Sequence, residues 1–182
     1  MDAKGWAARK CGCGYARDAR HDRLRDWLAA EHTALTGYAA PTEQRVPAWD
    51  QVNPVTGDLE EARLDIATCD PADGRAIYLD WSITCEHSTY APRRSARSNK
   101  DGLAAAHMVD TKRARYPPHG GELVPLVFES GGRASDEAIA FIRSYATGLE
   151  ATERAEVLST MWRRASRVLQ FGTADMVLSA LG

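Results

Sequence analysis

The sequence predicts an α/β domain with a core of one helix, an antiparallel pair of strands, a second helix and a further strand. Three observations predict it. Residues 62–68 and 76–84 alternate between apolar and polar side chains and are separated by a short turn sequence. Residues 101–116 carry an apolar stripe at helical spacing. Residues 123–129, LVPLVFE, have the composition of a buried strand.

Length and composition indicate one globular domain with at most a small appendage. The chain has 182 residues, of which 44% are hydrophobic and 26% charged, so it can bury a core without disulfides. Its four cysteines are too few and too scattered for a disulfide scaffold. No signal peptide is visible, and the longest apolar run, 123–128, is too short to span a bilayer. We therefore expect an intracellular protein with no membrane partner, and the nucleus is a candidate compartment.

The N-terminal third should contain one helix. Residues 1–18 lack periodicity and are interpreted as a flexible arm. A helix is predicted over 19–35, because Leu24, Trp27, Leu28 and Glu31 fall on one helical face. Residues 38–59 contain three prolines and should be mostly loop, with a short strand near 43–46.

The two alternating strands place a pair of aspartates opposite each other. Their turn, DPADG at 70–74, contains a proline and a glycine that suit a tight connection. Asp65 and Asp80 are equally far from the centre of this turn, so a symmetric hairpin makes them cross-strand partners. Opposed carboxylates destabilise a strand pair, unless a cation such as Mg²⁺ lies between them. The alternative is that both aspartates point to solvent from an exposed face.

The next helix, predicted over 101–116, carries a lysine within its apolar stripe. The stripe consists of Ala105, Met108, Val109, Lys112 and Tyr116. Lys112 either extends from the edge of the stripe to solvent, or reaches over the carboxylate pair and stabilises charge on a phosphate. Glu31, on the first predicted helix, also has two interpretations. It is either an additional metal ligand or a surface residue.

The remaining segments are a basic loop, a strand and C-terminal helices. From Pro92 to Arg115 there are seven basic residues and two acidic ones, although the net charge of the whole chain is only −2. Such a run is either a solvated surface or a phosphate-binding surface. In the strand at 123–129, Pro125 favours an edge position or a bulge. Helices are predicted from Ser135 or Asp136 to about 148, over 152–170, and from Thr173 onward.

Several short motifs in this order resemble a known superfamily. They are Arg63-Leu64-Asp65, then Leu79-Asp80-Trp81-Ser82 after fourteen intervening residues, then Lys112-Arg113-Ala114-Arg115-Tyr116, and FES with GG at 128–132. Residues 20–28, RHDRLRDWL, are similar to the first helix of the same proteins. Over roughly 20–146 the chain resembles the PD-(D/E)XK restriction-endonuclease-like superfamily. It is most similar to the branch that follows the reverse transcriptase in site-specific non-LTR retrotransposons.

The resemblance implies a PD-(D/E)XK nuclease-like core with C-terminal helices, and a domain spanning 19–148 followed by a helical extension at 149–182. It implies Mg²⁺, with Mn²⁺ as a substitute, bound by Asp65 and Asp80. Ser82 occupies the usual lysine position of the superfamily, and in this branch the helix supplies the lysine, which would be Lys112. Relatives carry an upstream zinc knuckle, of which Cys11, Cys13 and His21 remain.

These expectations lead to three functional hypotheses. Cys-x-Cys is a poor chelating spacing, so we do not expect structural zinc unless another residue such as His32 completes the site. The first hypothesis is a metal-dependent DNA endonuclease in which Asp65, Asp80 and Lys112 are catalytic and basic residues hold phosphates. These basic residues are Arg93, Arg94, Arg97, Lys100 and Arg115. The second is an inactive nucleic-acid-binding derivative of that domain, and the third is a relic without a nucleic-acid role.

Overall fold

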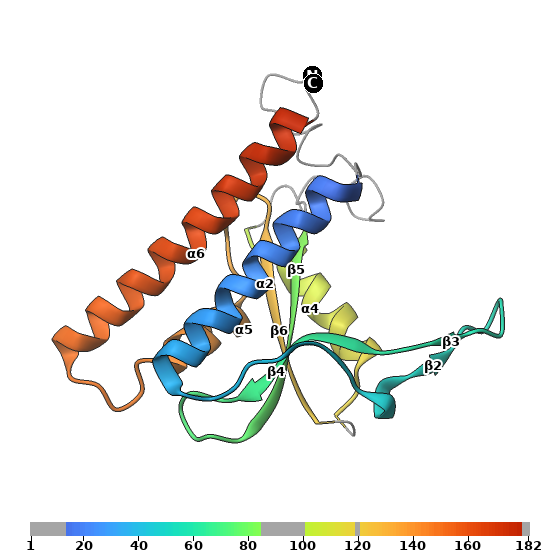
Figure 1. The fold of residues 1–182 in the computed structure, drawn as a ribbon, viewed down its shortest axis with the longest axis horizontal. Helices are drawn as coiled ribbons and strands as arrows, with labels where there is room; N and C mark the ends of the chain where they lie inside the picture. The colour runs from blue at the N-terminus through green and yellow to red at the C-terminus, as the bar shows by residue number, and fades with distance from the viewer. Residues whose placement is uncertain (1–13, 85–100, 119–120, 180–182) are drawn as a thin grey trace.

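The chain folds into a mixed α/β domain, seen in a computed structural model that describes residues 14–84, 101–118 and 121–179. A four-stranded sheet lies between helices (Figure 1). In chain order, the main elements are α2 (Gly14–Thr36), β1 (Thr42–Arg45), β4 (Arg63–Cys69), β5 (Ala76–Thr84), α4 (Leu103–Arg115), β6 (Glu122–Glu129), α5 (Asp136–Ser144) and α6 (Ala151–Ser179).

The sheet has the strand order β1-β4-β5-β6 and is mixed in direction. β1 and β5 run antiparallel to β4, whereas β6 runs parallel to β5. The parallel pair is possible because α4 crosses between the two strands. Among the described strands, β6 pairs only with β5, so it lies at an edge of this sheet, where a strand can accommodate Pro125.

The β4–β5 hairpin has the predicted register. Its pairs run from Cys69 opposite Ala76 to Ile66 opposite Leu79, which places the turn where the sequence predicts it. Within the turn, the Asp70 carboxylate accepts a hydrogen bond from the Ala72 N–H at 2.8 Å. Gly74 has a φ of 76°, a conformation that glycine adopts without strain. The turn chemistry therefore positions the two aspartates.

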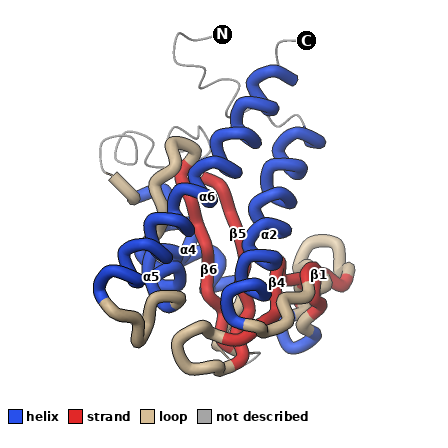
Figure 2. The backbone as a smooth tube through the Cα atoms, turned by 60° about the vertical axis from the view of Figure 1, so that its left-hand side comes forward, coloured by secondary structure: helices blue, strands red, loops and turns tan. Residues whose placement is uncertain are grey.

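The main core lies on one face of the sheet, beneath three helices. α2 contributes Leu24 and Leu28, as the predicted helical face requires. The other buried residues are Ile66, Ile77, Leu79, Trp81, Leu126 and Phe128 of the sheet, Ala138, Phe141 and Ile142 of α5, and Met161 and Leu169 of α6. Figure 2 shows α2 and α6 side by side along this layer.

α4 covers the opposite face of the sheet. Ala105 and Val109 are buried against Val127 of β6, and Met108 packs beside them, which confirms the predicted stripe. A further hydrophobic cluster consists of the buried residues Val46, Trp49, Ala62 and Leu64. Tyr116, which directly follows α4, is partly buried against this cluster. The helix is thereby held with Lys112 toward the sheet.

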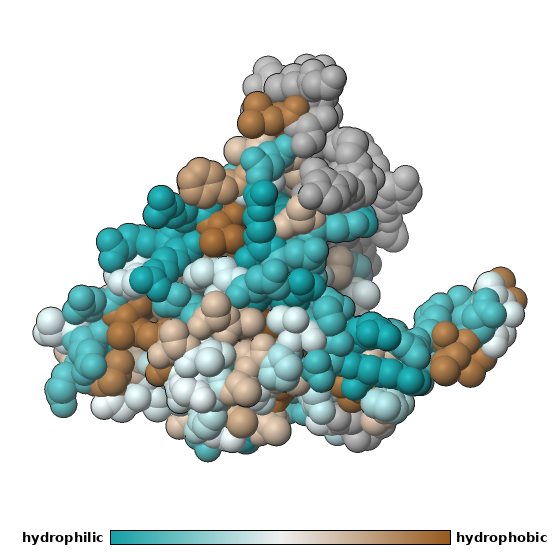
Figure 3. All heavy atoms as spheres, viewed as in Figure 1, coloured by the Kyte–Doolittle hydropathy of each residue, from teal (hydrophilic) through white to brown (hydrophobic). Residues whose placement is uncertain are grey.

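Some local expectations were wrong. α2 begins at Gly14 rather than residue 19, and α6 is one continuous helix to Ser179 rather than two. The expected 43–46 strand is β1, and the following loop also contains a 3₁₀ turn, Pro47–Trp49, and two short paired strands, β2 (Gln51–Val52) and β3 (Leu59–Glu60). Figures 1 and 3 show this β2–β3 hairpin projecting from the body, with exposed Val52, Val55 and Leu59.

The buried residues of β4 divide between the two clusters. Ile66 belongs to the main core, whereas Leu64 packs with Val46 and Trp49 in the other cluster. Between them, at the level of Asp65, β1 has Glu43 in a left-handed conformation with a φ of 54°.

No helix in the described ranges is both long enough and apolar enough to cross a membrane.

Candidate functional site

Asp65 and Asp80 lie together at the point where the hairpin ladder ends. Ladder pairing of β4 with β5 stops at Ile66 and Leu79, and one residue further on the Asp65 carboxylate accepts the Trp81 N–H at 2.5 Å. Both aspartates are buried, with 7% and 8% exposure. The alternative of two solvent-exposed aspartates is therefore wrong.

Lys112 reaches this pair from α4. Its Nζ lies 2.5 Å from Asp80 Oδ2 and 3.0 Å from the Trp81 carbonyl oxygen. The lysine side chain is only 11% exposed, so it does not extend into solvent. The ammonium thus sits where a carboxylate and a backbone carbonyl converge, and its position follows from the buried stripe of α4.

His21 of α2 is a member of this cluster that the sequence did not assign to it. Its Nε2 lies 3.2 Å from Asp65 Oδ2, and its Nδ1 lies 3.4 Å from Asp22. The hydrogen bond to Asp65 raises the pKa of His21 despite partial burial. The sequence contained a signal, because His21 lies one turn before Leu24 and two before Leu28 on the buried face of α2.

The two carboxyl groups have opposite pKa shifts. Burial raises the pKa of Asp80 to about 6, with the nearby Asp65 adding to the rise and Lys112 opposing it. Burial also acts to raise the pKa of Asp65, but the hydrogen bond and charge of His21, the Trp81 N–H and Lys112 outweigh it and lower that pKa. Paired acids whose pKa values are driven apart are typical of functional sites.

Glu31 does not join the pair. It lies ten residues after His21 on the same helix, which is about 15 Å along the axis. Its carboxylate oxygens both lie 2.5 Å from Arg164 Nη1 of α6, so it links two helices. In the described part of the chain, no group of three or more His, Cys, Asp or Glu side chains is arranged to hold a metal ion.

Of the five predicted phosphate-binding residues, one lies in the described part of the chain. Arg93, Arg94, Arg97 and Lys100 lie outside the described residues. Arg115 donates a hydrogen bond from Nη1 to the Trp49 carbonyl at 2.7 Å, and its guanidinium lies 5.0 Å from the centre of the Tyr116 ring. Arg115 therefore holds α4 against the 3₁₀ turn.

His32, the residue considered for completing a zinc site, is a core histidine. It is completely buried, and its two ring nitrogens lie 2.7 Å from the hydroxyls of Tyr145 and Thr68. Burial lowers its pKa. Cys11 and Cys13 lie outside the described residues, so the degraded zinc knuckle stays a prediction.

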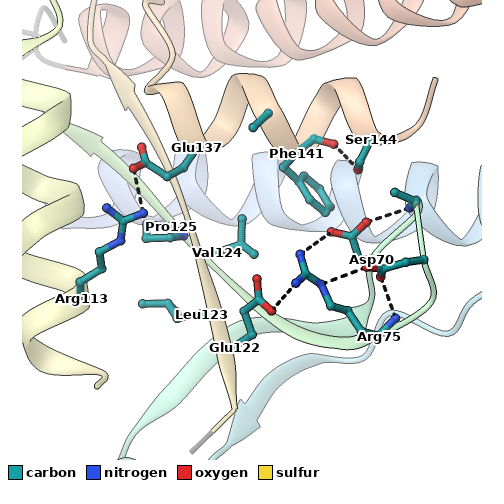
Figure 4. A pocket seen from close by; sticks show the side chains of 13 residues that line it. Asp70, Arg75, Arg113, Glu122, Leu123, Val124, Pro125, Glu137, Phe141 and Ser144 are labelled. Carbon is teal, nitrogen blue, oxygen red and sulfur yellow. Dashed lines mark hydrogen bonds and ion pairs between the residues drawn. The ribbon is translucent and has the colours of Figure 1, made fainter. Parts of the chain in front are cut away.

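A separate pocket of about 360 Å³ lies between the hairpin turn, the start of β6 and α5 (Figure 4). Its charged groups are already paired. Arg75 lies 3.0 Å from Glu122, and Arg113 lies 3.0 Å from Glu137. These ion pairs hold the hairpin turn to β6 and α4 to α5, which indicates a structural role.

Comparisons with known proteins find no matching family and no similar curated protein.

Proposed function

We propose that this chain is a metal-dependent DNA endonuclease domain of the PD-(D/E)XK kind, derived from a retrotransposon reverse-transcriptase polyprotein. The observation that carries the proposal is the convergence of Asp65, Asp80 and Lys112 from three separate elements. Burying two acids and a lysine together is costly in free energy. Domains tolerate such a cost where the groups perform chemistry.

The residues present fit a hard divalent cation. Two buried carboxyl groups provide oxygen ligands, which Mg²⁺ prefers. Burial is the main cause of the raised pKa of Asp80, and the nearby Asp65 adds to the rise. Asp65 and Asp80 would hold Mg²⁺ or Mn²⁺, which would supply positive charge for the phosphate oxygens.

The protein side chains then have distinct tasks. Lys112 donates hydrogen bonds that orient the attacking water or stabilise charge on the phosphate. His21 holds Asp65 in place through its Nε2 contact. Arg93, Arg94, Arg97 and Lys100 contact the DNA backbone without choosing sequence, and Arg115 supports α4. A DNA substrate is compatible with a nuclear location.

A second candidate is an inactive nucleic-acid-binding derivative. The observation that favours it is the direct ion pair between Lys112 and Asp80, which already neutralises one carboxylate. In this case the pair stabilises the fold and the basic segment retains DNA binding.

Plasmid nicking with Mg²⁺ and Mn²⁺ tests the proposal. The wild-type chain should nick supercoiled DNA in either metal and not in EDTA, and Asp65→Asn should abolish nicking. Asp110→Asn, an exposed acid on α4, is the matched control and should leave nicking unchanged.

DNA binding measured over a salt series separates the alternatives. Binding with a steep salt slope but no nicking would support the inactive derivative. If the protein neither bound nor nicked DNA, this result would support a relic without a nucleic-acid role.

A further inference from the structure

The most exposed large hydrophobic side chains of the described residues gather at two places. Val52, Val55 and Leu59 lie on the projecting β2–β3 hairpin (Figure 3). Phe171 and Leu178 lie on the C-terminal half of α6. Each of these five side chains is at least 59% exposed. Exposed apolar side chains that are gathered rather than scattered indicate a surface for a partner.

The hairpin holds its apolar side chains in a defined arrangement. Val52 pairs with Leu59, so the two side chains share one face of the hairpin. Asn53 organises the turn, because its side-chain oxygen accepts the Val55 N–H at 2.9 Å. We call residues 51–60 the arm. An arm that is ordered before it meets a partner loses little conformational entropy on binding.

The charges of the arm are all negative. Residues 46–62 include four acids and no Lys, Arg or His. Arg45 pairs with the two acids that flank the arm. The other two, Asp58 and Glu60, are exposed and form no ion pair within the described part of the chain. Phosphates would be repelled here, so the arm suits a partner surface that is apolar and basic.

α6 carries an exposed stripe of this complementary kind. Four exposed residues follow one another at intervals of four, four and seven, which places them on one side of the helix. We call them the α6 patch, and they are Arg163, Arg167, Phe171 and Leu178. Neither arginine pairs with an acid of the described ranges, and the Arg167 guanidinium lies 5.7 Å from the centre of the Phe171 ring. Asp175, an acid close to this stripe, is already paired with Arg23.

The arm and the α6 patch of one chain lie far apart. Figure 1 shows the arm projecting away from the body, on the side opposite α6. A contact between these two complementary surfaces therefore requires a second copy of the chain.

We propose that two copies of this chain form a dimer in which the arm of each copy docks on the α6 patch of the other. The apolar side chains of the arm cover those of the patch, and its two unpaired acids face the two arginines. One such contact is small beside the about 1,200–2,000 Å² that stable interfaces bury, and two-fold symmetry supplies it twice. Interfaces at the small end are transient, so the dimer dissociates on dilution. The inference does not depend on nuclease activity.

Sedimentation equilibrium over a range of protein concentrations tests the proposal, and the wild-type chain should show a reversible monomer–dimer equilibrium. Asp58→Arg on the arm and Arg167→Glu on the patch should each weaken self-association at least about tenfold, because like charges then meet in both contacts. An equal mixture of the two variants should associate about as well as the wild type. In that mixed dimer both contacts again join opposite charges.

Arg154→Glu is the matched control, because it makes the same charge reversal on α6 thirteen residues earlier, about 20 Å along the helix axis. It should self-associate like the wild type, and circular dichroism should show the same fold for all variants. A wild-type chain that stays monomeric, or a mixture that fails to restore association, would overturn the proposal. Loss of association in Asp58→Arg alone would indicate contact between two arms, and loss in Arg167→Glu alone contact between two patches. Either result would also overturn it.

Discussion

At the scale of single residues, Lys112 is the group on which the proposed chemistry depends most directly. Its ammonium bonds Asp80 and the Trp81 carbonyl, and α4 holds it there through Ala105 and Val109. Methionine has a similar length and helix propensity but no charge. Lys112 can therefore be replaced without removing its contribution to packing.

We expect Lys112→Met to reduce DNA nicking at least about 100-fold, because the donor that stabilises charge on the phosphate is lost. DNA binding should change much less, since most affinity comes from exposed basic residues. Arg113→Met is the control, because Arg113 is the next residue of α4 but pairs with Glu137 instead. Equal nicking by both variants would exclude a special role for Lys112.

Asp80 gives the stability of the metal-free protein a specific pH dependence. Its pKa is raised from 3.8 to about 6, so between these values the folded state binds more protons than the unfolded state. The free energy of unfolding must then decrease as the pH rises from about 4 to 6. The upper bound of this contribution is about 3 kcal/mol.

Urea unfolding in EDTA at pH 4, 5 and 6 checks this expectation. The wild-type protein should lose more stability over this range than Asp80→Asn, which cannot titrate. The Asp65 contribution is lost below pH 3.8, because its folded pKa is lowered, and lies outside this range. Parallel slopes for the two proteins would show that burial does not raise the pKa of Asp80.

At the scale of elements, the strands were more predictable than the relation between helices and sheet. Alternation and turn chemistry predicted the β4–β5 register, so Asp65 and Asp80 could be paired from sequence. Helical periodicity predicts which residues share a face, but not which level of the sheet each turn meets. For this reason Glu31 was one candidate for an additional ligand, whereas the α2 residue that contacts the pair is His21, at Asp65.

The crossing of α2 and α6 depends on a glycine. A Cβ at Gly172 would lie 2.4 Å from Cγ and 3.0 Å from Cβ of Arg20, too close for the first atoms of a side chain. Arg20 also donates a hydrogen bond to Thr173 at 3.3 Å, which holds it in this position. No sequence pattern indicated this contact, and Thr173 was expected to begin a new helix.

Gly172→Ala should therefore destabilise the protein by about 1–3 kcal/mol, although alanine normally favours a helix. Ser159→Ala, at an exposed position of α6, measures the propensity gain alone and should be neutral or slightly stabilising. Thermal unfolding of both variants checks the prediction. A more stable Gly172→Ala protein would show that α2 and α6 can move apart at little cost to accommodate the added methyl group.

At the scale of the whole molecule, α6 belongs to the same core as the sheet. Met161 and Leu169 lie in the cluster that includes Leu79 and Phe128. The segment 149–182 was expected to be an extension, and its amphipathic pattern alone could not show what it would cover. Its burial makes it part of the folding unit.

Leu169→Ala should lower the free energy of unfolding of the entire domain by about 2–5 kcal/mol in one cooperative transition. Phe171→Ala is the control, because Phe171 is 59% exposed and should change stability by less than about 0.5 kcal/mol. Tryptophan fluorescence during urea unfolding follows the core directly through Trp81. If Leu169→Ala produced an early separate transition and left the main one unchanged, α6 would be an independent appendage.

The two outer strands of the sheet have a consequence for self-association. A long, regular outer strand offers a row of free backbone groups to which a second copy can add. Here β6 contains Pro125, which has no N–H to donate, and β1 has only four residues, one of them in a left-handed conformation. Neither border of the described sheet is a good template for strand addition. The same features that disturb its regularity should therefore protect the folded protein from amyloid-like growth.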